Sequence, residues 1–76
     1  MYHGDLYVSV KCQPERIDLL RDEYLSIKPG YHLNKKHWIT LVINENYDVE
    51  AETEFALIKN SYQLILINYR KKHKIL

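Results

Sequence analysis

The amino-acid sequence predicts a small α+β domain formed by residues 1–76. Residues 6–11 alternate apolar and mixed residues with a two-residue period, and residues 37–43 are rich in β-branched and aromatic residues, which predicts two strands. Residues 14–24 and about 50–68 repeat apolar residues every three or four positions, which predicts two amphipathic helices. A chain of this length forms one domain at most, and its 46% hydrophobic content is typical of a folded globule.

The first strand is predicted at residues 6–11, where Leu6, Val8 and Val10 share one half-buried face. Ahead of it, the Gly4-Asp5 pair suits a tight hairpin turn. We therefore expect Tyr2-His3 to be the stub of a partner strand.

The first helix is predicted to begin at Pro14, because a proline in the first helical position loses no hydrogen bond. Ile17, Leu20 and Tyr24 recur at helical spacing, and the charged residues between them face water. The pattern predicts about three turns, ended by Pro29-Gly30, which also turns the chain.

The second strand, residues 37–43, follows a polar and basic segment and is largely apolar on both faces. One face consists of Trp38, Thr40 and Val42, and the other consists of Ile39, Leu41 and Ile43. A strand of this kind needs cover on both sides.

The last helix is predicted to be the main core helix. Its apolar face follows the spacing i, i+3, i+7, i+10 and i+14 and consists of Phe55, Ile58, Tyr62, Ile65 and Tyr69. Residues 44–58 carry five acidic side chains and no lysine or arginine, whereas residues 59–76 carry five lysines and arginines and no acidic side chain.

These elements leave too little material to cover the two-sided strand and the wide helix face, since small isolated sheets are marginal in water. Either the chain is part of a larger domain, or a second copy completes the core. We expect a homo-oligomer formed through the strand edge or the apolar helix face.

Several segments resemble the MmcQ/YjbR family. They are Lys11-Cys12, Pro14-Glu15, Leu19-Leu20-Arg21, Tyr24, the run from Pro29 to Trp38, and Ser61-Tyr62. The resemblance implies a CyaY-like fold in which two helices pack on one face of a small antiparallel sheet. It matches the C-terminal two thirds of a typical member, so residues 1–76 are expected to be a single partial YjbR-like domain, incomplete at the N-terminus. In family members the last helix usually ends in a Leu-Pro pair before its basic residues, but this chain has Tyr69-Arg70 there, so its last helix is expected to run on into Lys72. The resemblance also implies DNA binding.

Weak, largely sequence-independent phosphate contacts are expected from two basic segments and their neighbours. The candidate residues are Tyr31, Asn34, Lys35, Lys36, His37, Arg70, Lys71, Lys72 and Lys74. Alternatively, the cations near the end of the last helix only complement the helix dipole. Asn34 suits turn formation as well as base contact, and Tyr7, Tyr31 and Trp38 suit either base stacking or core packing.

The sequence predicts neither an enzyme nor a metal or cofactor site. Cys12 with His32 or His37 is the one nucleophile-and-base pair that can be named, and no third orienting group accompanies it. The histidines lack metal-ligand spacing. A single cysteine, no long apolar run and no signal-peptide pattern predict a cytoplasmic protein without a membrane partner.

Overall fold

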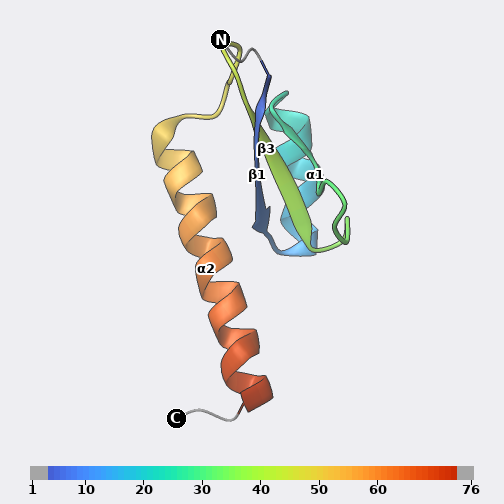
Figure 1. The fold of residues 1–76 in the computed structure, drawn as a ribbon, viewed down its shortest axis with the longest axis vertical. Coiled ribbons are helices and arrows are strands. Elements are labelled where there is room, and N and C mark those ends of the chain that lie inside the picture. Colours follow the sequence, from blue (N-terminus) through green and yellow to red (C-terminus); the bar gives the residue numbers. More distant parts are fainter. Residues whose placement is uncertain (1–3, 74–76) are drawn as a thin grey trace.

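The computed structural model describes residues 4–73. In chain order the elements are β1 (Leu6–Lys11), α1 (Pro14–Glu23), β2 (Ile27–Pro29), β3 (Trp38–Ile43) and α2 (Ala51–His73). The strands form one antiparallel sheet in the order β1-β3-β2 (Figure 1). The predicted α+β fold is confirmed, whereas the expected strand stub at Tyr2-His3 lies outside the described residues.

β3 is the central strand of the sheet. Leu41 pairs with Val8 of β1 on one side and with Ile27 of β2 on the other. Ile39 and Leu41 are both 0% exposed. They belong to one core cluster with side chains of both helices, including Ile17 of α1 and Leu57 of α2.

α1 ends earlier than predicted, and the short strand β2 was not predicted. Helix α1 ends at Glu23, and Tyr24 already has an extended backbone. The Asp48 carboxylate accepts hydrogen bonds from the amides of Leu25 at 2.7 Å and Ser26 at 3.1 Å. Ser26 in turn accepts the Val42 amide at 2.9 Å, so these tertiary contacts draw the chain into the sheet.

The apolar stripe predicted to form the core side of α2 is largely exposed. The buried positions of this helix are instead Leu57 at 1% and Ser61 at 6%. The predicted stripe residues are between 42% and 68% exposed: Phe55, Ile58, Tyr62, Ile65 and Tyr69. The prediction was wrong because α2 has a broader apolar surface than a three-stranded sheet can cover.

The two edges of the sheet, formed by β1 and β2, differ in how many of their outward backbone amides are hydrogen-bonded. In β1, the Cys12 amide donates to the His37 carbonyl at 2.8 Å, so residues 7, 9 and 11 direct their backbone groups to the open edge. Ser61 of α2 accepts the Lys11 amide there at 2.8 Å. At the other edge, the outward Ile27 amide donates to the Tyr24 carbonyl at 3.2 Å, and Pro29 has no amide proton. Among residues 4–73, the sheet therefore keeps unpaired outward amides only in β1, at Tyr7 and Ser9.

Asp48 makes the stability of this fold sensitive to acid. Desolvation raises the pKa of its carboxyl, but the hydrogen bonds from Leu25 and Ser26 outweigh this and hold the pKa below its ordinary value. A carboxyl whose folded-state pKa is lowered stabilises the fold above its unfolded-state pKa, and this contribution is lost as the pH falls through the folded-state pKa.

We therefore expect Asp48→Ala to lower the urea midpoint at neutral pH and to remove part of the stability lost in acid. Urea titrations at a series of pH values measure both effects. Asp18→Ala, an exposed aspartate of α1, is the matched control. If the urea midpoint falls with decreasing pH in the same way for Asp48→Ala and for the unsubstituted chain, Asp48 is not a source of the acid sensitivity.

Candidate nucleic-acid interface

The predicted basic segment forms the loop between β2 and β3, and Gly30 begins it. The Gly30 amide donates to the Trp38 carbonyl at 3.1 Å, which closes the base of the loop. A Cβ atom at Gly30 would lie 2.7 Å from the Trp38 Cβ atom, closer than side chains approach one another. The close approach of the two chain segments thus explains the glycine.

Two of the candidate polar residues hold the loop in shape. The Asn34 side-chain oxygen accepts the Lys36 amide at 2.8 Å, as expected for an Asn-initiated turn. The Lys35 ammonium donates to the carbonyls of Gly30 at 2.6 Å and Leu33 at 3.2 Å. Asn34 and Lys35 therefore position the loop, which leaves Lys36 as its outward cation.

Thr40 fastens the loop to the sheet on the face opposite the core. Its hydroxyl oxygen accepts the Tyr31 amide at 2.9 Å and shares a hydrogen bond with the Ser9 hydroxyl at 2.9 Å. Thr40 is 1% exposed. The loop backbone and the two strands β1 and β3 are thereby joined at one point.

An aromatic surface lies beside this point. The rings of Tyr7 and Tyr31 meet edge to face at 5.4 Å, and His32 lies 4.1 Å from the Tyr31 ring. Tyr7 is 51% exposed and Tyr31 is 58% exposed. Trp38 is half-buried, with the Lys11 ammonium 5.6 Å from its ring centroid. The two tyrosines are therefore the accessible aromatic residues, and Trp38 mainly packs.

Exposed lysines lie on the same sheet face and in the same loop as the two tyrosines. Lys28 pairs with Thr40 in the sheet, so its side chain shares the face that carries Tyr7 and Ser9. Lys28 and Lys36 are both exposed. Lys28 is an addition to the candidate residues, whereas Tyr7 was already a candidate for base stacking. Lys28 was missed because its place depends on β2, which the sequence did not reveal.

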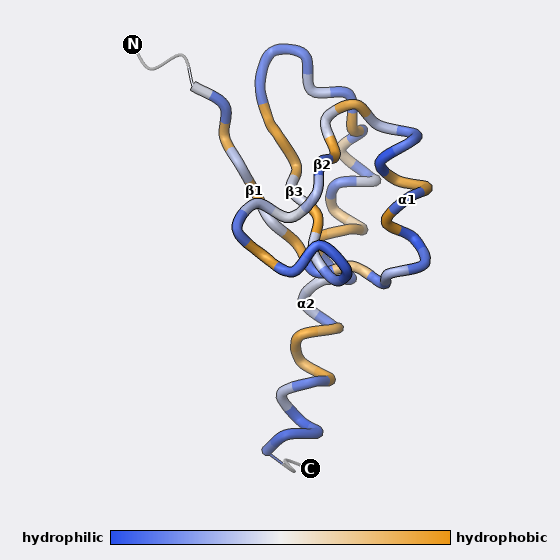
Figure 2. Tube along the Cα trace, turned by 90° about the vertical axis from the view of Figure 1, so that its right-hand side faces the viewer, coloured by the Kyte–Doolittle hydropathy of each residue, from blue (hydrophilic) through white to orange (hydrophobic). Residues whose placement is uncertain are grey.

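The second predicted cluster lies elsewhere. Arg70, Lys71 and Lys72 occupy the last turns of α2, as expected from a helix that continues without a proline. Both Figure 1 and Figure 2 show these turns projecting beyond the sheet, away from the loop formed by residues 31–37. Lys74 lies outside the described residues. The structure therefore groups the loop residues with one another and does not gather the two clusters on one local surface.

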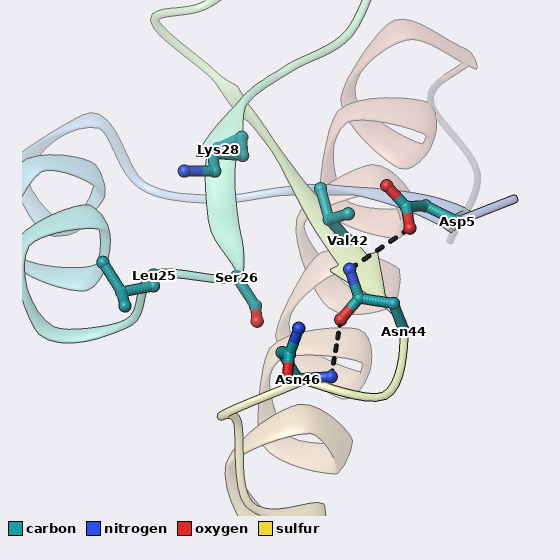
Figure 3. Close-up of a pocket in the computed structure, with 7 residues that line it drawn as sticks. All are labelled: Asp5, Leu25, Ser26, Lys28, Val42, Asn44 and Asn46. Atoms are coloured by element: carbon teal, nitrogen blue, oxygen red, sulfur yellow. Dashed lines mark hydrogen bonds between the residues drawn. The ribbon is translucent and has the colours of Figure 1, made fainter.

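A shallow pocket of about 310 Å³ lies near the turn that follows β3 (Figure 3). Its polar lining includes Lys28 and Asp5, and the Asp5 carboxylate accepts the Asn44 side-chain amide at 3.2 Å. Asn44 also accepts the Asn46 amide at 2.9 Å, so its side chain spans the turn. The pocket has no nucleophile with an adjacent base, and its hydrogen bonds serve the turn.

Cys12 is 1% exposed, and burial raises the pKa of its thiol. A buried thiol of this kind is unreactive, since the thiolate is the nucleophile. Within residues 4–73, no three His, Cys, Asp or Glu side chains converge as metal ligands would. The same part of the chain contains no helix with the length and apolar character needed to cross a membrane.

Comparison with known proteins gives a consistent assignment. A family model described as YjbR matches residues 1–64. The chain is 43% identical over 63 residues to the uncharacterised protein YyaQ of Bacillus subtilis (strain 168), covering 82% of this chain and 51% of YyaQ. It is 35% identical over 69 residues to the uncharacterised protein YbdF of Escherichia coli O157:H7, covering 91% of this chain and 55% of YbdF.

The solved structures give the same answer. The crystal structure of the Deinococcus radiodurans protein DR2400, described as a DUF419 domain, superposes with a TM-score of 0.76 at 38% identity. The match covers 92% of this chain and 54% of DR2400. The chain spans about half the length of the curated relatives it matches. On the family model and these relatives, the chain belongs to the YjbR family.

Proposed function

We propose that the chain binds DNA weakly, without reading base sequence, through the loop formed by residues 31–37 and the adjoining sheet face. The observation that carries this proposal is the pair of exposed tyrosines, Tyr7 and Tyr31, together with exposed Lys28 on the sheet face of Tyr7 and exposed Lys36 in the loop of Tyr31. Lysines neutralise phosphates, and tyrosine rings stack on unpaired bases. The chain is proposed to act as a binding protein and not as an enzyme.

The expected affinity is low because few cations are involved. Binding of this kind has a dissociation constant on the order of 10⁻⁴–10⁻⁶ M and falls steeply with salt. The stacking surface favours single-stranded DNA over a duplex, whose bases are already stacked. Arg70, Lys71 and Lys72 provide a second, separate contact for a longer DNA strand. The alternative role of these cations is only to stabilise the C-terminus of α2 through the helix dipole.

The test is fluorescence anisotropy with labelled single-stranded and duplex oligonucleotides across a salt series. We expect Lys36→Ala to weaken binding and to reduce the slope of log affinity against log salt by about 1. Lys59→Ala, which removes an exposed cation of α2 outside both clusters, should leave the slope unchanged. Tyr31→Ala should weaken single-stranded binding more than duplex binding.

Absence of binding to either oligonucleotide at about 50 mM salt, where the counterion contribution is large, would overturn the proposal. Equal slopes for Lys36→Ala and the unsubstituted chain would remove the loop from the interface. If the slope of log affinity against log salt falls only when Arg70, Lys71 and Lys72 are all replaced by alanine, the DNA-binding site lies on α2 and not on the loop.

A second candidate function is that of a non-catalytic protein-interaction module. The observation that favours it is the exposed apolar stripe of α2, in which Phe55 is 68% exposed and Tyr62 is 65% exposed. Soluble proteins rarely expose large contiguous apolar patches without a binding role.

A further inference from the structure

The exposed stripe of α2 has the spacing of a coiled-coil seam. Its members alternate at three and four residues along two heptads: Phe55, Ile58, Tyr62, Ile65 and Tyr69. A heptad repeat keeps one apolar line facing a partner helix along the whole length of the contact. The spacing thus fits another helix as the partner, in preference to a small ligand.

The stripe is separate from the part of α2 that packs on the sheet. At 3.6 residues per turn, the centre of the stripe lies about a third of a turn around the helix from the side that carries Leu57 and Ser61. Figure 1 shows that the side of α2 remote from β1 is not covered by another described element, and that its last turns extend past the sheet. A second helix can therefore approach without displacing the core.

The charges of α2 indicate whether the partner helix runs parallel or antiparallel to it. The first turn carries Glu52 and Glu54, and the last turns carry Arg70, Lys71 and Lys72. A parallel pair of α2 helices would place like charges together at both ends, whereas an antiparallel pair would place each acidic end beside a basic end. Opposite charges beside an apolar seam set the orientation of helix pairs.

We propose that α2 pairs with α2 of a second copy in an antiparallel, two-fold symmetric dimer, with Tyr62 near the axis. Residues equally distant from Tyr62 then oppose each other, so Phe55 meets Tyr69 of the other copy, and Glu52 lies near Lys72. The seam is self-complementary, as a two-fold interface requires. This proposal rests on the second candidate function and is independent of DNA binding.

Sedimentation velocity across a concentration series tests the dimer. We expect reversible dimers of the unsubstituted chain at micromolar concentrations, and at least tenfold weaker association for Tyr62→Glu. Gln63→Glu is the matched control, since it adds the same charge at the next exposed position, outside the stripe. Circular dichroism should show the same helix content for both variants. Raising the salt concentration should weaken the dimer, because the paired ends attract.

Disulfide trapping tests the direction. One variant carries Glu52→Cys and the other carries Lys72→Cys, with the buried Cys12 left in place in both. On mild oxidation of a mixture, we expect mainly the disulfide that joins the two different variants. The unsubstituted chain should form no disulfide, because Cys12 is inaccessible.

Three results would overturn the proposal. A chain that stays monomeric at about 100 µM, well above a micromolar dissociation constant, has no such dimer. A dominant disulfide between two Glu52→Cys chains, with association strengthened by salt, would show a parallel pair, while the interaction function itself would stand. A monomer that instead forms a complex with the unmatched half of YyaQ would show that the stripe fits the rest of a YjbR domain.

Discussion

Leu41→Ala is expected to remove a large part of the stability of the chain and to lower its urea midpoint steeply. Leu41 is 0% exposed at the centre of the sheet, between Val8 and Ile27. Truncating a buried leucine to alanine costs about 2–5 kcal/mol. A domain of 76 residues has a total stability of only about 4–11 kcal/mol at about 0.05–0.15 kcal/mol per residue.

Urea denaturation followed by circular dichroism measures this loss. Leu25→Ala is the matched control, because it makes the same chemical change at a side chain that is 82% exposed. We expect the control to change the free energy of unfolding by less than about 0.5 kcal/mol. Similar midpoints for the two variants would show that Leu41 does not occupy the core.

Thr40→Val is expected to have the second-largest effect and to act on the loop as well as on stability. Valine has nearly the same shape, but it cannot accept the Tyr31 amide or bond to the Ser9 hydroxyl. Leaving a buried donor without a partner costs about 1–3 kcal/mol. Because the lost bond holds the start of the loop, the Tyr31 amide should also exchange its proton faster.

Urea denaturation and hydrogen exchange of the Tyr31 amide check the two parts of this prediction. Thr40→Ser keeps the hydroxyl and removes one methyl group, so it should preserve the slow exchange while losing some stability. Fast exchange at Tyr31 in both variants would mean that packing, and not the hydroxyl, fixes the loop.

Local patterns predicted most of the fold. The two-residue periodicity of residues 6–11 predicted β1, and the β-branched and aromatic content of residues 37–43 predicted β3, where Ile39 and Leu41 were correctly assigned to one face. Pro14 marked the start of α1, and the lack of a proline after Tyr69 marked the long α2. These features depend on neighbouring residues, which a sequence displays directly.

Features set by distant contacts were missed. β2 has three residues, one of them Pro29, and it is held in place by Asp48, about twenty residues further along. The apolar stripe of α2 was assigned to the core because periodicity shows that a face is apolar but does not show what covers it. Lys28 was likewise missed, because its place in the candidate interface depends on the register of β2.

The unequal edges of the sheet limit how the chain can assemble by backbone pairing. An incoming strand finds outward amides along β1, whereas the β2 edge has its Ile27 amide already bonded and a proline in place of the next donor. If β1 of one molecule pairs with β1 of another, the β1 edges of both molecules are occupied. Through backbone pairing alone, growth then stops at two molecules, because the β2 edge has no free donor to receive a third strand.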